Sequence, residues 1–284
     1  MSEIKKVTVL GTGVLGAQIA FQTAYNGFEV SAYDINEQAI EAARQRMAGL
    51  VTSYKADFPE APDGKAEDTL NRLSYFTDLA KAVADADLVI EAVPEVLEIK
   101  RDLYTRLSKV APAKTIFATN SSTLLPSAIK DFTGRPGKFL ALHFANLIWK
   151  HNVVEVMGTT ETDASVIETC MTFAPKIGMV PVAIHKEKAG YIMNTLSVPF
   201  LRAALELVVD GYAEPADVDK VWRISNGVPY GPFQVLDIVG MNTPYNVFGH
   251  SDEKGRLIAD WIKQNYIDKG KLGLSSGEGF YTYP

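Results

Sequence analysis

Two ionisable residues, His143 and Glu155, stand where apolar segments end and resume. His143 stands near the end of the run "KFLALHF", and Glu155 lies in "VVEVM" after the connection 145–152. Histidine is the usual proton carrier at neutral pH, and a bonded carboxylate orients the ring and stabilises its charged form. If the two segments pair as antiparallel strands, the side chains meet at one end of a sheet. They form either a dyad for general acid–base chemistry or a structural ion pair.

Hydroxyl and amide side chains could complete such a site. Ser121 and Ser122 follow the apolar run "TIFATN", and loops beyond the carboxyl ends of strands line the ligand crevice of doubly wound sheets. Asn194 begins a helical stripe of apolar residues, which directs it toward a core or a cleft. A hydroxyl and an amide that converge on one imidazole would suit a carbonyl or alkoxide oxygen.

A glycine-rich stretch near the N-terminus has the spacing of a dinucleotide-binding loop. The stretch "VTVLGTGVLGAQIA" follows a strand-like run and opens a helix. In this context the glycines permit a tight turn, close approach of a pyrophosphate and helix–strand packing. The expected cofactor contacts in the loop are Gly11, Gly13, Val14, Leu15 and Gly16.

Asp34 ends the second strand-like run, 18 residues after Gly16. An acid at this place accepts hydrogen bonds from the adenosine ribose hydroxyls and repels a 2′-phosphate. The residues that follow, "INEQ", contain no arginine. The sequence therefore predicts NAD(H) rather than its 2′-phosphorylated form.

The elements that must position these residues follow an alternating pattern. Helical stretches separate short β-branched runs, several of them nearly all apolar, as in strands covered on both faces. The expected strands are 6–11, 29–34, 87–93, 115–120, 138–144, 153–157 and 180–184. This order predicts an α/β fold with a Rossmann-type, doubly wound, mainly parallel sheet. Only helical patterns follow residue 187, so we expect domains at 1–187 and 188–284, the second smaller and all-α.

The composition excludes several other classes of protein. The chain has 284 residues, of which 47% are hydrophobic and 22% charged. The net charge of −6 argues against a nucleic-acid partner. No apolar run approaches the roughly 20 residues of a membrane helix, and no Cys/His cluster has the spacing of a zinc site. The single cysteine, Cys170, favours a reducing, cytoplasmic compartment.

Several motifs in order resemble the short-chain L-3-hydroxyacyl-CoA dehydrogenase family. They are "GTGVLGAQIA", "EAVPEVLEIKRDLY", "FATNSSTL", "LHFANLIWKHNVVEV", "GYIMN", "GVPYGPFQVLDIVG" and the final "GEGFYTY". The resemblance covers essentially the whole chain. It implies an NAD(H)-dependent enzyme that interconverts β-carbonyl and β-hydroxy groups of a small-molecule substrate. It also implies a homodimer formed through the helical second domain.

The resemblance implies a role for each polar residue. His143 would be the general acid/base and Glu155 its partner. Ser122 and Asn194 would donate hydrogen bonds to the substrate oxygen. The residues implied on the nicotinamide side of the cofactor are Glu95, Lys100, Ser122 and Asn146.

The chain departs from the family pattern after the histidine. The family usually reads H-F-F-N-P, whereas this chain reads "HFANLIWKHN". That stretch resembles the bacterial diketoreductase branch of the family, which reduces 3,5-dioxo esters. We therefore expect a substrate pocket that differs in shape from that of the family, with Trp149 and Trp222 in its wall. Trp222 fits a core or interface position equally well.

The helix after Asp34 also differs from that of relatives that use CoA. Those relatives carry lysines there, whereas this helix has Arg44, Arg46 and Lys55 and then turns acidic. Three hypotheses follow. The first is reduction of β-keto or 3,5-diketo esters. The second is a 3-hydroxyacyl-CoA (3-hydroxybutyryl-CoA) dehydrogenase of fatty-acid metabolism. The third, a non-catalytic NAD-binding structural protein, has no need for all four polar residues of the site.

Overall fold

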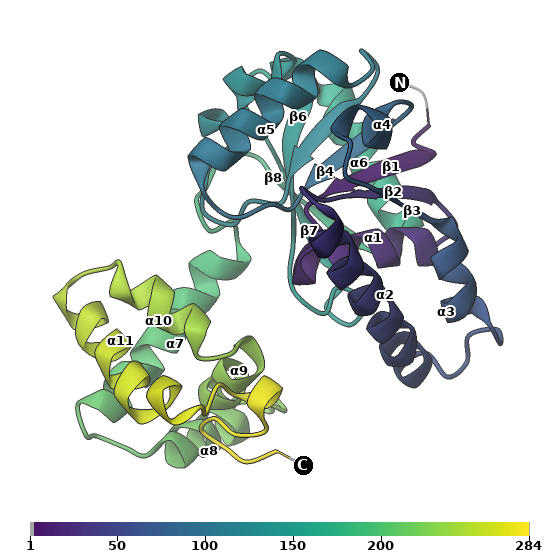
Figure 1. Cartoon of the computed structure of the whole chain (residues 1–284). Coiled ribbons are helices and arrows are strands. Elements are labelled where there is room, and N and C mark those ends of the chain that lie inside the picture. Colours follow the sequence, from purple (N-terminus) through teal and green to yellow (C-terminus); the bar gives the residue numbers. More distant parts are fainter. Residues whose placement is uncertain (1–2, 284) are drawn as a thin grey trace. The chain divides into compact units, whose positions relative to one another are not determined.

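The chain folds into two compact units. The structure is a computed structural model that describes residues 3–283. The first unit extends to Ile192, and the second begins at Met193 (Figure 1). Within the described residues, no helix combines the length and the apolar character that crossing a bilayer requires.

One sheet forms the centre of the first unit. Among residues 3–283 it has eight strands in the order β3-β2-β1-β4-β5-β6-β7-β8. Every neighbouring pair is parallel except β6 and β7, which are antiparallel. The strands are β1 (Lys6–Leu10), β2 (Glu29–Tyr33), β3 (Leu73–Phe76), β4 (Leu88–Glu91), β5 (Ile116–Thr119), β6 (Phe139–Phe144), β7 (Val153–Gly158) and β8 (Val180–Ile184). The predicted α/β fold is confirmed.

Strand β3 is the one strand of the described sheet that the sequence pattern did not indicate. It has four residues and stands at the edge of the sheet, beside β2. Leu73 is buried, Ser74 is exposed, and the last two residues are half-buried. So short and mixed a run gives no clear period, and its pairing with β2 decides its conformation.

Helices connect the strands and build the second unit. In the first unit they are α1 (Val14–Tyr25), α2 (Glu37–Asp57), α3 (Lys65–Asp68), α4 (Leu79–Val83), α5 (Leu97–Val110) and α6 (Ala164–Lys176). In the second unit they are α7 (Met193–Val209), α8 (Pro215–Asn226), α9 (Pro232–Val239), α10 (Asn242–Gly249) and α11 (Glu253–Asn265). Short 3₁₀ turns lie at Thr69–Arg72, Pro126–Ala128, Lys130–Thr133, Pro136–Lys138, Ile267–Lys269 and Leu274–Ser276.

Each face of the sheet has its own hydrophobic core. Side chains alternate along a strand, so Leu88 and Ile90 pack in the core that contains α1, α2 and α6. Val89 points the other way, into the core that contains α4 and α5. Burial on both faces explains why the strands read as nearly continuous apolar runs.

The carboxyl ends of four parallel neighbours, β1, β4, β5 and β6, lie along one edge of the sheet. Because β7 is antiparallel to β6, its first residues reach the same edge. From β1 the chain turns to β2 and β3 on one side and later returns to β4 on the other. Such a switch point is where doubly wound sheets bind ligands.

The second unit is a helical domain with a separate core. Its fully buried side chains come from several helices and include Leu205, Phe233, Leu236, Ile258 and Ile262. Among the described residues after Met193, the only β-type pairs are two isolated bridges at Glu278. The expected all-α character of this part is therefore observed.

Candidate active site

His143 and Glu155 face each other across the antiparallel pair of β6 and β7. They are directly opposite in the strand register, and His143 Nδ1 lies 2.9 Å from Glu155 Oε2. Their side chains are only 5% and 6% exposed. A carboxylate can only accept, so Nδ1 carries the proton in this bond. The contact predicted from the sequence is present, and it holds the imidazole in one tautomer.

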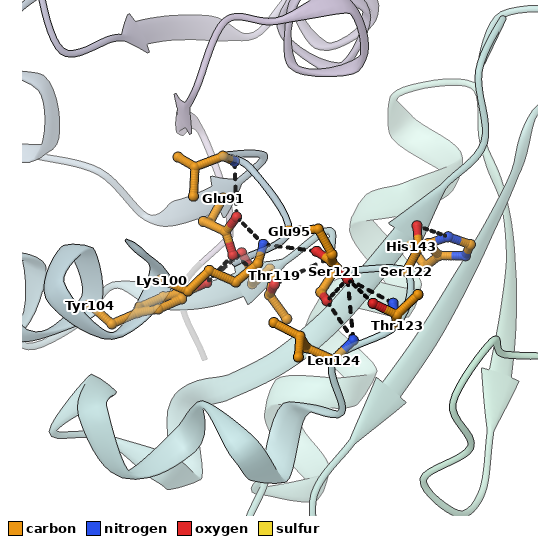
Figure 2. Close-up of polar contacts among 12 residues, drawn as sticks. Glu91, Glu95, Lys100, Tyr104, Thr119, Ser121, Ser122, Thr123, Leu124 and His143 are labelled. Atoms are coloured by element: carbon orange, nitrogen blue, oxygen red, sulfur yellow. Dashed lines mark hydrogen bonds and ion pairs between the residues drawn. The ribbon is translucent and has the colours of Figure 1, made fainter. Parts of the chain in front are cut away.

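Ser122 contacts the other ring nitrogen. Its Oγ lies 3.0 Å from His143 Nε2, and Figure 2 shows the two side chains facing each other. Ser122 belongs to the turn 121–124, which follows β5. The hydroxyl of Ser121 donates instead to Glu95. The geometry therefore separates the two serines that the residue pattern left equivalent.

Tyr191 covers one face of the imidazole. The two rings stack with centroids 4.2 Å apart and planes 13° from parallel. The Tyr191 hydroxyl donates to the carbonyl of Ser121 at 2.8 Å, and the next residue, Ile192, donates its N–H to Glu155 Oε1 at 2.8 Å. Burial, with Glu95 and Glu155 nearby, raises the pKa of Tyr191, so its hydroxyl remains a donor. Sequence reasoning did not assign Tyr191; its only signal was the motif "GYIMN".

The glycine loop has the shape that a pyrophosphate needs. Gly11 has a φ of +90°, and a Cβ there would stand 2.7 Å from the carbonyl oxygen of Ala92. A Cβ on Gly16 would stand 1.9 Å from the oxygen of Gly11. Around Gly13, by contrast, such a Cβ would meet nothing within 4 Å among the described residues beyond its immediate chain neighbours. Gly13 immediately precedes α1, whose first N–H groups lack intrahelical partners.

Asp34 follows β2 beside this loop. Its Oδ2 accepts hydrogen bonds from the Thr12 amide at 2.8 Å and the Thr12 hydroxyl at 2.6 Å. A cavity of about 310 Å³ opens here. It is lined in part by Gly11, Tyr33, Asp34, Ile35, Val93 and Ile99. Apolar walls suit an aromatic base, and the carboxylate suits ribose hydroxyls, so the residues fit the adenosine half of NAD(H).

Glu95 orders the turn that carries Ser122. Its Oε1 accepts from Thr123 N at 2.7 Å, Thr123 Oγ1 at 2.9 Å and Leu124 N at 3.2 Å, in addition to the Ser121 hydroxyl. Burial by itself would raise the pKa of Glu95. These donors and the nearby ammonium of Lys100 outweigh burial and lower the pKa to about 2.

Both units match family models. The model of the 3-hydroxyacyl-CoA dehydrogenase NAD binding domain matches residues 6–188, and that of the C-terminal domain matches residues 190–283. The chain belongs to the 3-hydroxyacyl-CoA dehydrogenase family. As a member, it is an NAD-dependent oxidoreductase that acts on CH–OH groups of a small-molecule substrate. These similarities to dehydrogenases do not favour the third hypothesis, a non-catalytic NAD-binding structural protein.

Individual relatives support the same assignment. The chain is 37% identical to mitochondrial hydroxyacyl-coenzyme A dehydrogenase of Rattus norvegicus, over 99% of this chain and 91% of the relative. It is 35% identical to the Homo sapiens enzyme, with the same shares covered. A solved structure described for substrate-directed dual catalysis of dicarbonyl compounds by diketoreductase is 59% identical, with a TM-score of 0.96 and 100% of both chains covered.

Lys100 and Asn146, both implied on the nicotinamide side of the cofactor, differ in their exposure to solvent. The side chain of Lys100 is 1% exposed, and its ammonium pairs with Glu91 at 2.6 Å and Glu95 at 3.3 Å. Asn146 is exposed, on the connection between β6 and β7. Lys100 therefore supports Glu95 from inside the protein, whereas Asn146 is open to a ligand.

The connection 145–152 is fixed to α1 and α2. Gln18 of α1 accepts the N–H of Leu147 at 2.7 Å, and Leu147 has a φ of +59°. Trp149 is 9% exposed, and its indole donates to Asp57 at 2.8 Å while the ring packs 5.0 Å from that of Tyr54. Trp149 thus lies in the core beside α2, where it anchors the loop. From the sequence it was expected in the wall of a substrate pocket, and this packing against α2 was not predicted.

Asn194 and Trp222 belong to the second unit. Asn194 lies in the first turn of α7 and is half-buried. Trp222, on α8, is 39% exposed, and its ring lies 4.5 Å from that of Phe200. Both residues therefore lie on helices of the C-terminal domain.

Two residues to which the sequence analysis gave no role make contacts close to the candidate active site. Asn120 accepts the N–H of Phe144 at 2.9 Å and so ties the end of β5 to the end of β6, next to His143. Glu91, fully buried at the end of β4, pairs with Lys100. The sequence signals for Glu91 were a charged residue inside the apolar run "DLVIEAV" and its place as the first residue of the motif "EAVPEVLEIKRDLY".

Proposed function

We propose that the protein is an NADH-dependent reductase of β-keto and 3,5-diketo esters, with His143, Glu155, Ser122 and Asn194 as its catalytic residues. One observation carries the proposal. A buried imidazole lies between a carboxylate and a hydroxyl, at the sheet edge that also carries the glycine loop and Asp34. This is the arrangement needed to transfer one proton to or from a substrate oxygen.

Held by the glycine loop and Asp34, NADH would supply the hydride that reduces the carbonyl carbon of the substrate. In the same step His143 donates its Nε2 proton to the substrate oxygen, while Glu155 stabilises the imidazolium before transfer. Ser122 and Asn194 donate hydrogen bonds to that oxygen as negative charge develops on it. Each positioned donor typically contributes about 2.7–4 kcal/mol to the stabilisation of the transition state. Oxidation of the hydroxy compound uses the same groups in reverse.

The cofactor contacts are proposed from the same geometry. Gly11, Gly13 and Gly16, together with Val14 and Leu15, would hold the pyrophosphate against the start of α1, and Asp34 the adenosine ribose. Glu95 and Asn146 would face the nicotinamide. Lys100 is the exception, because its burial favours an indirect role through Glu95.

Two observations favour esters over CoA thioesters as substrates. The first is the 59% identity with a structure described as a diketoreductase acting on dicarbonyl compounds. The second concerns the three basic residues of α2, all of which have intramolecular partners. Arg44 lies 4.0 Å from the ring centroid of Tyr75, Lys55 pairs with Glu67 at 2.5 Å, and Arg46 donates to the carbonyl of Thr12 at 3.3 Å.

A steady-state panel with NADH tests this proposal. Acetoacetyl-CoA, ethyl acetoacetate, a 3,5-dioxohexanoate ester and free acetoacetate are compared at equal concentrations. We expect kcat/KM to be highest for the diketo ester and CoA to inhibit weakly. Turnover of the thioester alone, with competitive inhibition by CoA, would favour 3-hydroxyacyl-CoA dehydrogenase, the second candidate function. No NADH oxidation with any of the four would refute both.

The proposal includes a homodimer built through the helical unit and a cytoplasmic location. The described surface of α8 exposes Val221 at 66% and Ile224 at 74%, three residues apart on one helix face. Large exposed apolar side chains grouped in this way are typical of interfaces. Cys170 is free and buried, which suits a reducing compartment.

A further inference from the structure

We propose that Glu91 is a positioning residue that fixes Ser122 against His143 through Lys100, Glu95 and the turn 121–124. The inference rests on the proposed function, because it concerns the same site. It adds a residue that touches neither substrate nor cofactor. Figure 2 shows the connected contacts, from Glu91 at one end to the facing side chains of Ser122 and His143 at the other.

Glu91 is held in one conformation at the carboxyl end of β4. Its side chain is 0% exposed. Oε1 accepts from Lys100 Nζ at 2.6 Å and from the N–H of Val93 at 2.9 Å, and Oε2 accepts from the Thr119 hydroxyl at 2.7 Å. A buried carboxylate with donors on both oxygens has little freedom to move.

Lys100 transmits this order to Glu95. Its ammonium, also buried, lies between Glu91 Oε1 and Glu95 Oε2, at 2.6 Å and 3.3 Å. The negative charge of Glu91 balances the ammonium, so that Glu95 is not attracted away from the turn. Without that charge, Glu95 would be the nearest carboxylate to Lys100. The attraction between Lys100 and Glu95 would then compete with the hydrogen bonds that Glu95 makes to the turn.

Glu95 divides its two oxygens between the lysine and the turn. Oε2 faces Lys100, whereas Oε1 accepts from the backbone amides of Thr123 and Leu124 and from two hydroxyls. A movement of Glu95 toward Lys100 would therefore release the turn that carries Ser122. Ser122 Oγ must stay at its 3.0 Å distance from His143 Nε2 to serve the proton transfer.

The same strand supplies a matched control. Asp87 immediately precedes β4, accepts the N–H groups of Lys5 and Lys6 at 2.9 Å and 3.0 Å, and pairs with Lys114 at 2.5 Å. It is thus an ion-paired carboxylate like Glu91, although its side chain is 11% exposed, and it lies at the opposite end of the strand. Loss of either charge affects the stability of β4, whereas only Glu91 connects to the turn.

The experiment compares Glu91→Gln and Asp87→Asn by hydrogen–deuterium exchange and by steady-state kinetics. The exchange is measured on the full chain without ligand. In Glu91→Gln we expect the amides of residues 121–124 to exchange about ten-fold faster. We also expect kcat to fall about ten-fold, with a smaller change in the KM for NADH. Asp87→Asn should lower the melting temperature without either effect.

The outcomes separate the inference from the proposed function. Unchanged exchange at 121–124 in folded Glu91→Gln, or equal acceleration in Asp87→Asn, would overturn the inference. If the wild-type chain reduces no β-keto compound, the proposed function fails, but the exchange measurement still decides the role of Glu91. If Glu91→Gln does not fold, Glu91→Asp keeps the charge but withdraws the carboxylate from Lys100, which leaves Glu95 as the nearer partner of the ammonium. It should accelerate exchange in the same turn, and protection equal to wild type would overturn the inference.

Discussion

The surroundings of His143 assign a task to each ring nitrogen. Glu155 fixes the proton on Nδ1, so Nε2 is the only ring position at which a proton can be gained or lost during reaction. Ser122 lies beside Nε2, in the direction in which the proposed transfer would move the proton, and Tyr191 restricts rotation of the ring by stacking on it. Orientation by the carboxylate thus matters as much as its charge.

Replacement of His143 by alanine removes the proposed proton donor and leaves the glycine loop intact. We expect His143→Ala to lower kcat by about 10²-fold or more, with the dissociation constant for NADH nearly unchanged in a fluorescence titration. His151→Ala is the control, because His151 is exposed on the connection 145–152. Wild-type turnover by His143→Ala would remove the histidine from the mechanism.

We expect Asp34 and Arg46 together to set the choice between NADH and NADPH. Asp34 would repel a 2′-phosphate, whereas the Arg46 guanidinium, 3.3 Å from the oxygen of Thr12, places a positive charge beside the same loop. We expect Asp34→Ala to weaken NADH binding about ten-fold, as for two lost hydrogen bonds, and to strengthen NADPH binding. The double variant Asp34→Ala with Arg46→Ala should lose the stronger binding of NADPH. The dissociation constants of NADH and NADPH for both variants measure these changes. A gain that persists without Arg46 would contradict this explanation.

At the scale of elements, turns and strand ends do most of the positioning. The turn 121–124 is held by Glu95, and the connection 145–152 is held by Gln18 and Asp57. Neither segment is a regular helix or strand, so side-chain hydrogen bonds replace the backbone pattern that would otherwise fix it. This explains why polar residues outside the reactive centre decide where Ser122 and Asn146 lie.

The turn 121–124 should be sensitive to acid. Because the pKa of Glu95 is about 2 in the folded protein, below its ordinary value of 4.5, its ionised form contributes stability that is complete above about pH 4.5. That contribution is lost as the pH falls from 4.5 toward 2. We expect Glu95→Gln to show a smaller loss of unfolding free energy than wild type between pH 5 and pH 3, measured by urea denaturation. Equal losses in the two proteins would contradict a lowered pKa of Glu95.

At the scale of the whole molecule, the proposed site residues come from both units. The first carries the glycine loop, Asp34 and the His143–Glu155 pair; the second has its own core and carries Asn194, together with the exposed face of α8. Two separate cores mean that the units need not share one cooperative transition. A second copy of the chain, bound through α8, would cover the apolar face of the second unit.

A dimer through α8 predicts a mass of about twice the 31.1 kDa of the chain. We expect light scattering after size exclusion to give this value for wild type. The double change Val221→Glu and Ile224→Glu should give monomers, because burying two carboxylates at an interface is costly. Val110→Glu, at a valine of α5 that is 41% exposed, is the control and should remain dimeric. A monomeric wild type would refute the assembly, and dimeric double variants would move the interface elsewhere.

The sequence by itself determined the class of fold, the cofactor and the site's main pair. Apolar runs of strand length, a glycine loop followed by an acid, and a histidine and glutamate at strand ends are local patterns, and local patterns follow from backbone geometry and burial. It did not reveal β3, which is too short to show a period and depends on pairing with β2.

Only the tertiary structure decided how the remaining polar residues divide their tasks. It separated Ser122 from Ser121, stacked Tyr191 on the imidazole, buried Trp149 beside α2 and linked Glu91 to Lys100. Each of these contacts joins segments far apart in the chain, and their partners are chosen by packing and by the need to satisfy buried polar groups. Neither constraint leaves a periodic mark on the sequence.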